Sequence, residues 1–148
     1  MILKIGKALN SFRTGLNCAQ SVVTTYSDEF EFDYHLACNL SFGFGGGMGK
    51  MQETCGAVTG AFMVLSIFNS KINQSCFKNE ENNLSIKLFT HKFKLIHGTI
   101  NCKSLLNCDL NTVEGQFFIK EHNLRESVCE KCISDSIIIL EELLEIKK

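Results

Sequence analysis

The chain has 148 residues, of which 45% are hydrophobic and 21% are charged, a composition typical of a globular protein that excludes a disordered chain. Its 15 basic and 16 acidic side chains leave a formal charge of −1, which gives no electrostatic basis for binding nucleic acid or an anionic membrane. Proline is absent, which favours long helices separated by glycine and asparagine.

Helical signals dominate from the start of the chain. The sequence predicts a first helix over residues 4–13, which ends at Gly15. Asn17 is the predicted N-cap of a second helix, and Gln20, three residues later, completes a partial capping box. A short helix is predicted over residues 33–40.

A glycine-rich run, GFGGGMG, occupies residues 43–49. It matches neither the dinucleotide-binding nor the Walker pattern, and no predicted strand precedes it. Glycine permits positive φ and close backbone approach, so two interpretations stay open. Either its amides face an anion such as a sulfur near Cys55, or the loop is squeezed between packed helices. The candidate cofactor-binding glycines are Gly45, Gly46, Gly47, Gly49 and Gly56.

The most apolar stretch of the chain, residues 57–68, lies in the next predicted helix, which Thr54 is expected to cap. This stretch is too short for a membrane span, which needs about 20 apolar residues. Gly56 and Gly60 favour close helix packing. The polar run KNEENN at 78–83 predicts an exposed loop.

Capping signals continue towards the C-terminus. A helix is predicted over 85–97, with Gly98 ending it. Asn101 is expected to cap a short turn, and a further helix over 112–122 is weakened by Gly115. Ser127-Val-Cys-Glu130 has the spacing of a capping box and is predicted to open the last helix.

Alternation typical of strands is absent, and no repeat or linker divides the chain. We therefore predict an all-α fold, a compact single-domain helical bundle over residues 1–148 with a glycine-rich loop. The N-terminal segment contains no apolar run of the kind found in secretory signals, so we expect a cytoplasmic protein with reduced thiols.

Eight cysteines are present, and four of them fall in the first turn of a predicted helix. A helix N-terminus offers unpaired N–H groups and partial positive charge, which stabilise a thiolate. Because the thiolate is both the nucleophile and the metal ligand, these four are candidate metal ligands or, without metal, redox thiols. They are Cys18, Cys55, Cys102 and Cys129.

The remaining cysteines carry weaker signals. Cys132 forms a Cys-x-x-Cys motif with Cys129, which is either a redox pair or half of a metal site. The motif follows no βαβ pattern and has no second copy, so thioredoxin-like and zinc-ribbon interpretations are disfavoured, and we interpret Cys132 as a core residue. His97 is interpreted as a favourable cation at a helix C-terminus. The other extra cysteines are Cys38, Cys76 and Cys108.

Three blocks of sequence, Asn17-Cys-Ala-Gln20, Phe44-Gly-Gly-Gly-Met-Gly49 and Cys55-Gly-Ala-Val-Thr-Gly60, resemble the C_GCAxxG_C_C family of putative redox-active proteins. Cys102-Lys-Ser-Leu-Leu106 and Cys129-x-x-x-Ile133 resemble its last two cysteine blocks. The resemblance covers about residues 3–144. It implies a small, mostly helical domain with four functional cysteines, the same four that the capping pattern selects.

We therefore expect a redox function, and whether the protein is an enzyme stays open. The first hypothesis is an iron–sulfur cluster used for electron transfer, held by the four cysteines. The second is thiol–disulfide exchange or redox sensing without a cofactor, and the third is a structural Cys₄ zinc site. A helical binding module with incidental cysteines is disfavoured by the capping pattern. We expect an unidentified redox partner protein, no nucleic acid and no membrane, and leave a homodimer open.

Overall fold

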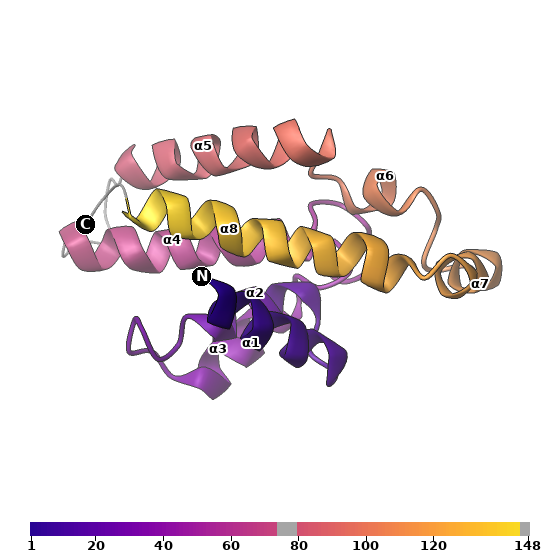
Figure 1. The fold of residues 1–148 in the computed structure, drawn as a ribbon, viewed down its shortest axis with the longest axis horizontal. Coiled ribbons are helices and arrows are strands. Elements are labelled where there is room, and N and C mark those ends of the chain that lie inside the picture. Colours follow the sequence, from indigo (N-terminus) through magenta and orange to yellow (C-terminus); the bar gives the residue numbers. More distant parts are fainter. Residues whose placement is uncertain (74–79, 146–148) are drawn as a thin grey trace.

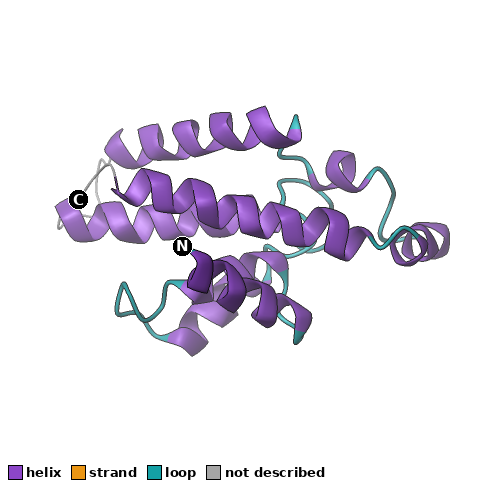
Figure 2. Ribbon diagram, viewed as in Figure 1, coloured by secondary structure: helices purple, strands orange, loops and turns teal. Residues whose placement is uncertain are grey.

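The computed structural model describes residues 1–73 and 80–145, and within this part the chain is helical (Figures 1 and 2). The only pairing of β type there is an isolated antiparallel bridge between Thr54 and Asn101, which confirms the all-α prediction. The elements are α1 (Ile2–Arg13), α2 (Cys18–Thr25), α3 (Tyr34–Phe42), α4 (Gly56–Asn73), α5 (Glu80–His97), α6 (Cys102–Leu106), α7 (Val113–Glu121), the π-helical turn η1 (Arg125–Glu130) and α8 (Lys131–Glu145).

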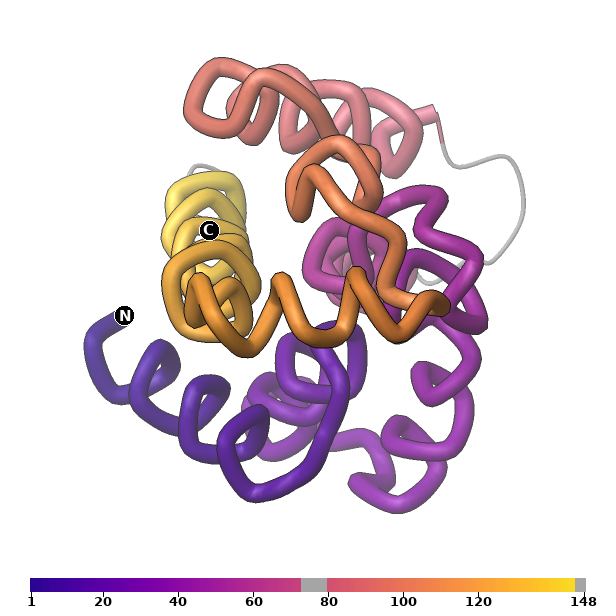
Figure 3. The backbone as a smooth tube through the Cα atoms, turned by 90° about the vertical axis from the view of Figure 1, so that its right-hand side faces the viewer, coloured from indigo at the N-terminus to yellow at the C-terminus, as the bar shows by residue number. Residues whose placement is uncertain are grey.

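The three long helices pack against one another as a group. α4 packs against α8, and α5 packs against both. α1, α2 and α3 lie along one side of this group, with α2 against α4 and α1 against α8. α6, α7 and η1 gather at one end, and Figure 3 shows the orange segment with α7 and η1 crossing that end. Residues at the N-termini of α2 and α4 and at the start of α8 lie around one cavity at this end.

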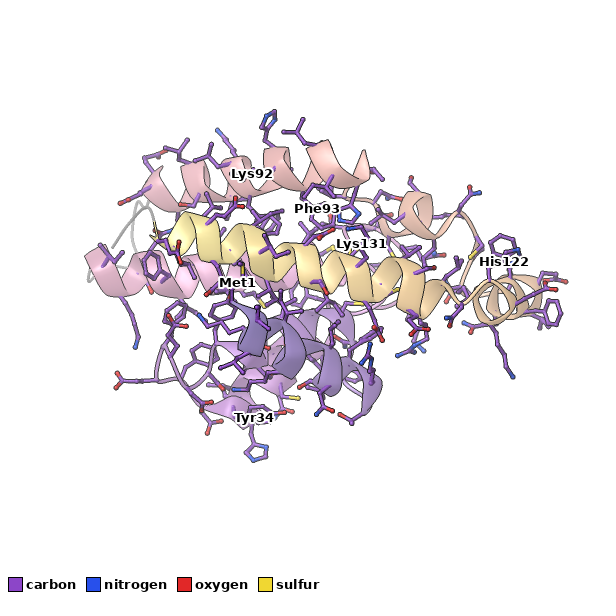
Figure 4. All side chains as sticks on the ribbon, viewed as in Figure 1. Met1, Tyr34, Lys92, Phe93, His122 and Lys131 are labelled. Atoms are coloured by element: carbon purple, nitrogen blue, oxygen red, sulfur yellow. The ribbon has the colours of Figure 1, made fainter. Side chains whose placement is uncertain are left out.

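The hydrophobic core lies where α1 and α2 pack against the three long helices and where these three pack against one another. α8 is strongly amphipathic and buries Ile133, Ile137 and Leu140 completely, as expected from their helical spacing. α5 contributes Phe89 and Phe93, both fully buried, and Phe93 is labelled where α5 faces α8 in Figure 4. No helix in the described ranges is long and apolar enough to cross a membrane.

The predicted boundaries at Ser127 and at residues 80–83 are wrong. Ser127 does not cap the last helix, because its amide and its hydroxyl both donate to the carbonyl of Asn123, at 3.0 and 3.1 Å, so it already lies inside a helical turn. Residues 80–83 are the first turn of α5 and not a loop. Glu80 and Glu81 stand there beside the positive end of the helix dipole, and Asn82 donates to the Ser66 hydroxyl on α4 at 2.9 Å.

The other helices begin and end within a few residues of their predicted bounds, apart from α4, which continues to Asn73 instead of ending near residue 68. The predicted caps at Asn17 and Asn101 are both present as side-chain hydrogen bonds to helix amides, and Thr112, where the predicted helix begins, caps α7 in the same way. Cys76 and positions 78–79 of the predicted loop lie outside the described residues.

Candidate functional site

A cavity of about 610 Å³ lies at the end of the molecule where the caps meet, and five thiols line it. Four are the cysteines selected from the sequence, and the fifth is Cys132. The glycine-rich run forms part of its wall. The lining includes Cys18, Cys55, Cys102, Cys129 and Cys132, together with Gly45, Gly46, Gly47, Gly49 and Gly56.

Cys55 and Cys102 are brought together by the short antiparallel bridge. The Cys55 amide donates to the Ile100 carbonyl at 2.7 Å, and the Cys102 amide donates to the Glu53 carbonyl at 2.6 Å. This bridge takes Thr54 away from the predicted cap position. Cys55 itself is the N-cap of α4, since its carbonyl accepts the first helical bonds, from Val58 and Thr59, both at 3.0 Å.

The glycine-rich loop approaches Cys102 closely. Five consecutive residues, 46–50, have positive φ, and two of them, Met48 at 67° and Lys50 at 62°, are not glycine. A Cβ on Gly47 would lie 2.7 Å from the Cys102 Cβ and 2.7 Å from the Gln52 Cα, so only glycine fits there. The left-handed backbone thus lets the loop form a cavity wall directly over a thiol.

Most of the loop's own amides are used within the loop. Those of Met48, Gly49 and Lys50 donate to carbonyls of residues 44, 43 and 45, at 3.2, 2.7 and 3.2 Å. These three amides therefore do not face the thiols. The packed-loop interpretation holds for this part of the run, and its contribution to the cavity is backbone surface.

Gln52 is a buried residue that no sequence signal indicates. Its side chain donates to the Cys108 carbonyl at 2.9 Å and accepts from the Leu110 amide at 3.0 Å. These bonds fasten the segment after α6 to the loop before α4. The Cys108 thiol is not among the groups that line the cavity.

Cys18 begins α2 within a complete capping box. The Asn17 side chain accepts from the Gln20 amide at 3.0 Å, and the Gln20 side chain accepts from the Asn17 amide at 2.9 Å. Gly60 allows α4 to approach this helix start, because a Cβ there would lie 2.9 Å from the Ala19 carbonyl. A Cβ on Gly56 would lie 3.1 Å from the Ala19 amide. Close packing of α2 and α4, as predicted for these glycines, holds Cys18 beside Cys55.

Cys129 lies in the π-helical turn η1 and not at a helix start, so this part of the sequence prediction is wrong. The turn is held on α1 by two contacts. Arg13 forms a two-pronged pair with Glu130, at 2.8 and 2.6 Å, and the Arg125 guanidinium lies 4.6 Å from the centre of the Phe12 ring. π-Helical turns are frequent at functional sites because they displace side chains from the regular helical register.

The Cys18 and Cys129 thiols form a first pair. A hydrogen bond between their side chains raises the pKa of Cys18, with burial acting in the same direction. The same bond lowers the pKa of Cys129, and the nearby Arg125 adds to that lowering. The contact between the two thiols therefore shifts their pKa values in opposite directions.

Cys55 and Cys132 form a second pair. A hydrogen bond from Cys132 lowers the pKa of Cys55, assisted by the amides of Ala57 and Val58 at the start of α4. The same bond and burial raise the pKa of Cys132. The Cys-x-x-Cys motif is thus divided between the two pairs, with Cys129 facing Cys18 and Cys132 facing Cys55.

Cys102 is the unpaired member of the group. Burial raises its pKa to about 12, with Cys55 and Cys129 adding to the effect. Helix N-termini therefore do not lower the pKa of all four selected cysteines, because the hydrogen bond with Cys129 and burial raise it at Cys18, and burial raises it at Cys102. In the described part of the chain, no three His, Cys, Asp or Glu side chains are arranged to hold a single metal ion.

Cys38 lies apart from this group, on α3, where its sulfur accepts a hydrogen bond from the Gln20 side chain at 3.3 Å.

Two residues that the sequence analysis did not select as site residues lie near Cys132: His97 and Asp135. Only the position of Asp135 three residues after Cys132, on the same helix face, could have indicated them.

The family model for the C_GCAxxG_C_C putative redox-active proteins matches residues 16–143, and the chain belongs to this family. The match includes all the thiols that line the cavity. No curated protein and no solved structure gives a significant match to the chain.

Proposed function

We propose that the protein binds an iron–sulfur cluster in the thiol-lined cavity and transfers electrons to or from a redox partner protein. Cys18, Cys55, Cys102 and Cys129 are the proposed ligands. The observation that supports this most is that four cysteines from four separate segments, in a family described as redox-active, line one cavity of about 610 Å³.

The residues present fit such a group in their chemistry. Cysteine thiolates are the usual ligands of iron–sulfur clusters, and burial and nearby backbone groups tune the cluster potential. Gly47 leaves space at Cys102 that any side chain would fill. A cluster contains several iron atoms, so its ligands need not converge on one point as they must around a single ion. When bound, a cluster would accept and release single electrons.

The chain's own contribution is to hold the ligands and shield them. The bridge between residues 52–55 and 100–103 fixes Cys55 and Cys102, and the capping box fixes Cys18. The Arg13–Glu130 pair holds the turn that carries Cys129. Cys55 is 6% and Cys102 8% exposed, so water has little access to either sulfur.

One observation favours a second candidate function, thiol–disulfide exchange without a cofactor. Cys18 and Cys129 share a side-chain hydrogen bond, and one thiol of the pair has a lowered pKa, as an exchange reaction requires. A Cys₄ zinc site has less support. Zinc–sulfur bonds of about 2.3 Å require all thiolates to converge, and the described residues contain no such group of three.

Anaerobic purification followed by reconstitution with iron and sulfide tests the proposal. We expect a brown protein with bound iron and acid-labile sulfide. Serine at position 18, 55, 102 or 129 should remove most of the iron. The matched control is Cys38→Ser, which changes a cysteine that does not line the cavity and should leave the iron content unchanged.

A colourless preparation that holds no iron after reconstitution would overturn the proposal. Thiol–disulfide exchange would then be favoured if redox titration showed a two-electron couple among these thiols. One zinc ion per chain would favour the structural site instead.

A further inference from the structure

The exposed rim of the thiol-lined cavity carries charge of one sign. Two charged side chains belong to the lining, Lys50 and Arg125, and both are exposed cations. No aspartate or glutamate among the described residues lines the cavity. The cavity lies at the end of the molecule that faces the viewer in Figure 3, and its volume of about 610 Å³ is in the usual range of small-molecule sites. Apart from the thiols, a small anion would meet only positive side-chain charge here.

The Arg125 guanidinium is available to bind an oxyanion. It lies over the Phe12 ring, 4.6 Å from the ring centre, and this contact does not use its N–H groups. Those N–H groups form a planar fork that matches two oxygens of a carboxylate or a phosphate. The carboxylate of Glu130, also on η1, is already bound through both oxygens to Arg13, at 2.8 and 2.6 Å. Arg125 therefore keeps its fork for another anion.

Lys50 is fixed at the rim by its backbone. Its amide donates to the Gly45 carbonyl at 3.2 Å, and its carbonyl accepts from the Asn111 side chain at 2.8 Å. A Cβ on Gly46 would lie 3.0 Å from the Lys50 Cα and Cγ, so the stem of the side chain packs on that glycine. In the described part of the chain, neither Lys50 nor Arg125 forms an ion pair with a carboxylate.

Two amides of the glycine-rich loop add further donors. Gly46 and Gly47 both line the cavity, and among the described residues no group accepts a hydrogen bond from either amide. Gly47 is buried, and a buried amide without an acceptor is rare in proteins. Successive amides in a turn of this kind form concave anion-binding sites. These two therefore suit an anion that also meets the neighbouring Lys50.

The rest of the wall is mainly apolar, which favours an organic anion over an inorganic one. An apolar body would remove this surface from water, whereas a bare phosphate or sulfate ion would leave it wet. The side chains that form this part of the wall are Phe12, Leu16, Leu106, Leu110, Ile119 and Val128.

We propose that the cavity binds a small organic anion, a carboxylate or a phosphate on an apolar body. Lys50, Arg125 and the amides of Gly46 and Gly47 hold the oxyanion, and the body lies against the apolar wall. This site goes beyond the proposed function and does not depend on a cluster, so the iron-free chain binds the anion as well.

The test uses the full-length, reduced, iron-free protein and the fluorescent aromatic sulfonate 8-anilinonaphthalene-1-sulfonate. We expect one bound probe per chain. Hexanoate should displace the probe at about tenfold lower concentration than neutral hexanamide, because a hydrogen bond to a charged group is stronger than one to a neutral group. Inorganic phosphate should displace it less well than hexanoate.

Two results of this displacement experiment would overturn the proposal. Equal displacement by hexanoate and hexanamide would exclude a site that selects anions. Displacement by phosphate as strong as that by hexanoate would exclude the contribution of an organic body.

Charge-removing variants locate the bound probe. A neighbouring pocket on α7 is lined by Arg125 and Lys120 but not by Lys50, which lines only the cavity. We expect Lys50→Gln and Arg125→Gln each to weaken binding about tenfold. Lys120→Gln should bind as wild type does. A loss in Lys120→Gln without a loss in Lys50→Gln would move the anion to the neighbouring pocket and overturn the proposal.

Lys103→Gln is the matched control for net charge. Lys103 is an exposed cation on α6 that lines neither pocket, so this variant should also bind the probe as wild type does. An equal loss in Lys103→Gln and Lys50→Gln would mean general attraction to a positive surface and would exclude a defined site.

The anion site and the cluster can fail separately. Lys50→Gln should keep wild-type iron and sulfide after reconstitution, because Lys50 is not a proposed ligand. Charge-selective displacement in a chain that never binds iron would leave the anion site standing and exclude the cluster. Iron binding without any preference for hexanoate over hexanamide would do the reverse.

Discussion

Two pairs of thiols line the cavity, and they show the same pattern of pKa shifts but differ in their surroundings. In each pair one thiol has a raised pKa and donates to a partner whose pKa is lowered. Cys18 and Cys129 are partly exposed, and Arg125 lies near enough to Cys129 to lower its pKa. Cys55 and Cys132 are buried, and beside Cys132 stands an imidazole held by a carboxylate.

This difference shows that spacing in a motif does not identify partners. Cys129 and Cys132 would read as one pair in sequence, yet the π-helical turn between Arg125 and Glu130 changes the helical register just before α8 begins. The two sulfurs consequently belong to different pairs. Cys102 links these pairs, since it lies near both thiols of lowered pKa, Cys55 and Cys129.

The largest effect is expected from a substitution at Gly47, which packs closely against Cys102. In Gly47→Ala the new Cβ would meet the Cys102 Cβ at 2.7 Å in a backbone with φ of 69°. Left-handed strain and overpacking together predict a loss of about 3 kcal/mol in the free energy of unfolding, measured with urea. We also expect the bound iron to fall sharply.

Gly43→Ala is the matched control in the same loop. Its φ is −64°, and a Cβ there would have no neighbour within 4 Å, so stability should stay near that of wild type. Equal losses for the two variants would mean that the loop is sensitive to any side chain, and that contact with Cys102 is not the cause.

The next effect tests whether each pair acts independently. Cys18→Ala removes the S–H that lowers the pKa of Cys129. Because only the thiolate is alkylated, the pH midpoint for iodoacetamide labelling of Cys129 should move upward. A rise of about one pKa unit corresponds to about tenfold slower labelling below the midpoint.

Peptide mapping of the labelled protein provides the comparison. Cys132→Ala should slow labelling of Cys55 and leave Cys129 unchanged, and Cys102 should stay unlabelled near neutral pH because its pKa is raised to about 12. If Cys18→Ala slowed both Cys55 and Cys129 equally, the thiols would form one coupled network and the division into pairs would be wrong.

Much of the fold could be predicted from local signals. Side-chain caps at Asn17 and Asn101 act within one helical turn, so the sequence alone indicates them. Ser127 has the same sequence signal but does not cap a helix, because its amide and hydroxyl both donate to the Asn123 carbonyl in the preceding turn. Thr54 does not cap α4, because it forms a β-bridge with Asn101, which is distant in the sequence. Local patterns cannot anticipate such competition.

The site was predictable in part for the same reason. Cys18, Cys55 and Cys102 stand at helix starts, which sequence signals locate well. The contact between Cys132 and His97 depends on α5 lying beside α8. These two residues are 35 positions apart, and no local pattern specifies that they meet. Burial was the other missing quantity. It reverses the expected pKa shift at Cys102, and at Cys18 it adds to the larger effect of the hydrogen bond with Cys129.

The smallest expected effect compares how the two helix starts are capped. Asn17 caps the helix that carries Cys18 with a side-chain oxygen, so Asn17→Ala should lower the free energy of unfolding by about 1 kcal/mol. Cys55 caps α4 with its own sulfur, which accepts from the amides of Ala57 and Val58. Serine is among the best N-cap residues, so Cys55→Ser should keep this cap and change stability by less than about 0.5 kcal/mol. Urea unfolding of the reduced, iron-free proteins measures both. A larger loss for Cys55→Ser than for Asn17→Ala would show that the Cys55 sulfur stabilises the fold through its contact with Cys132 more than through the cap.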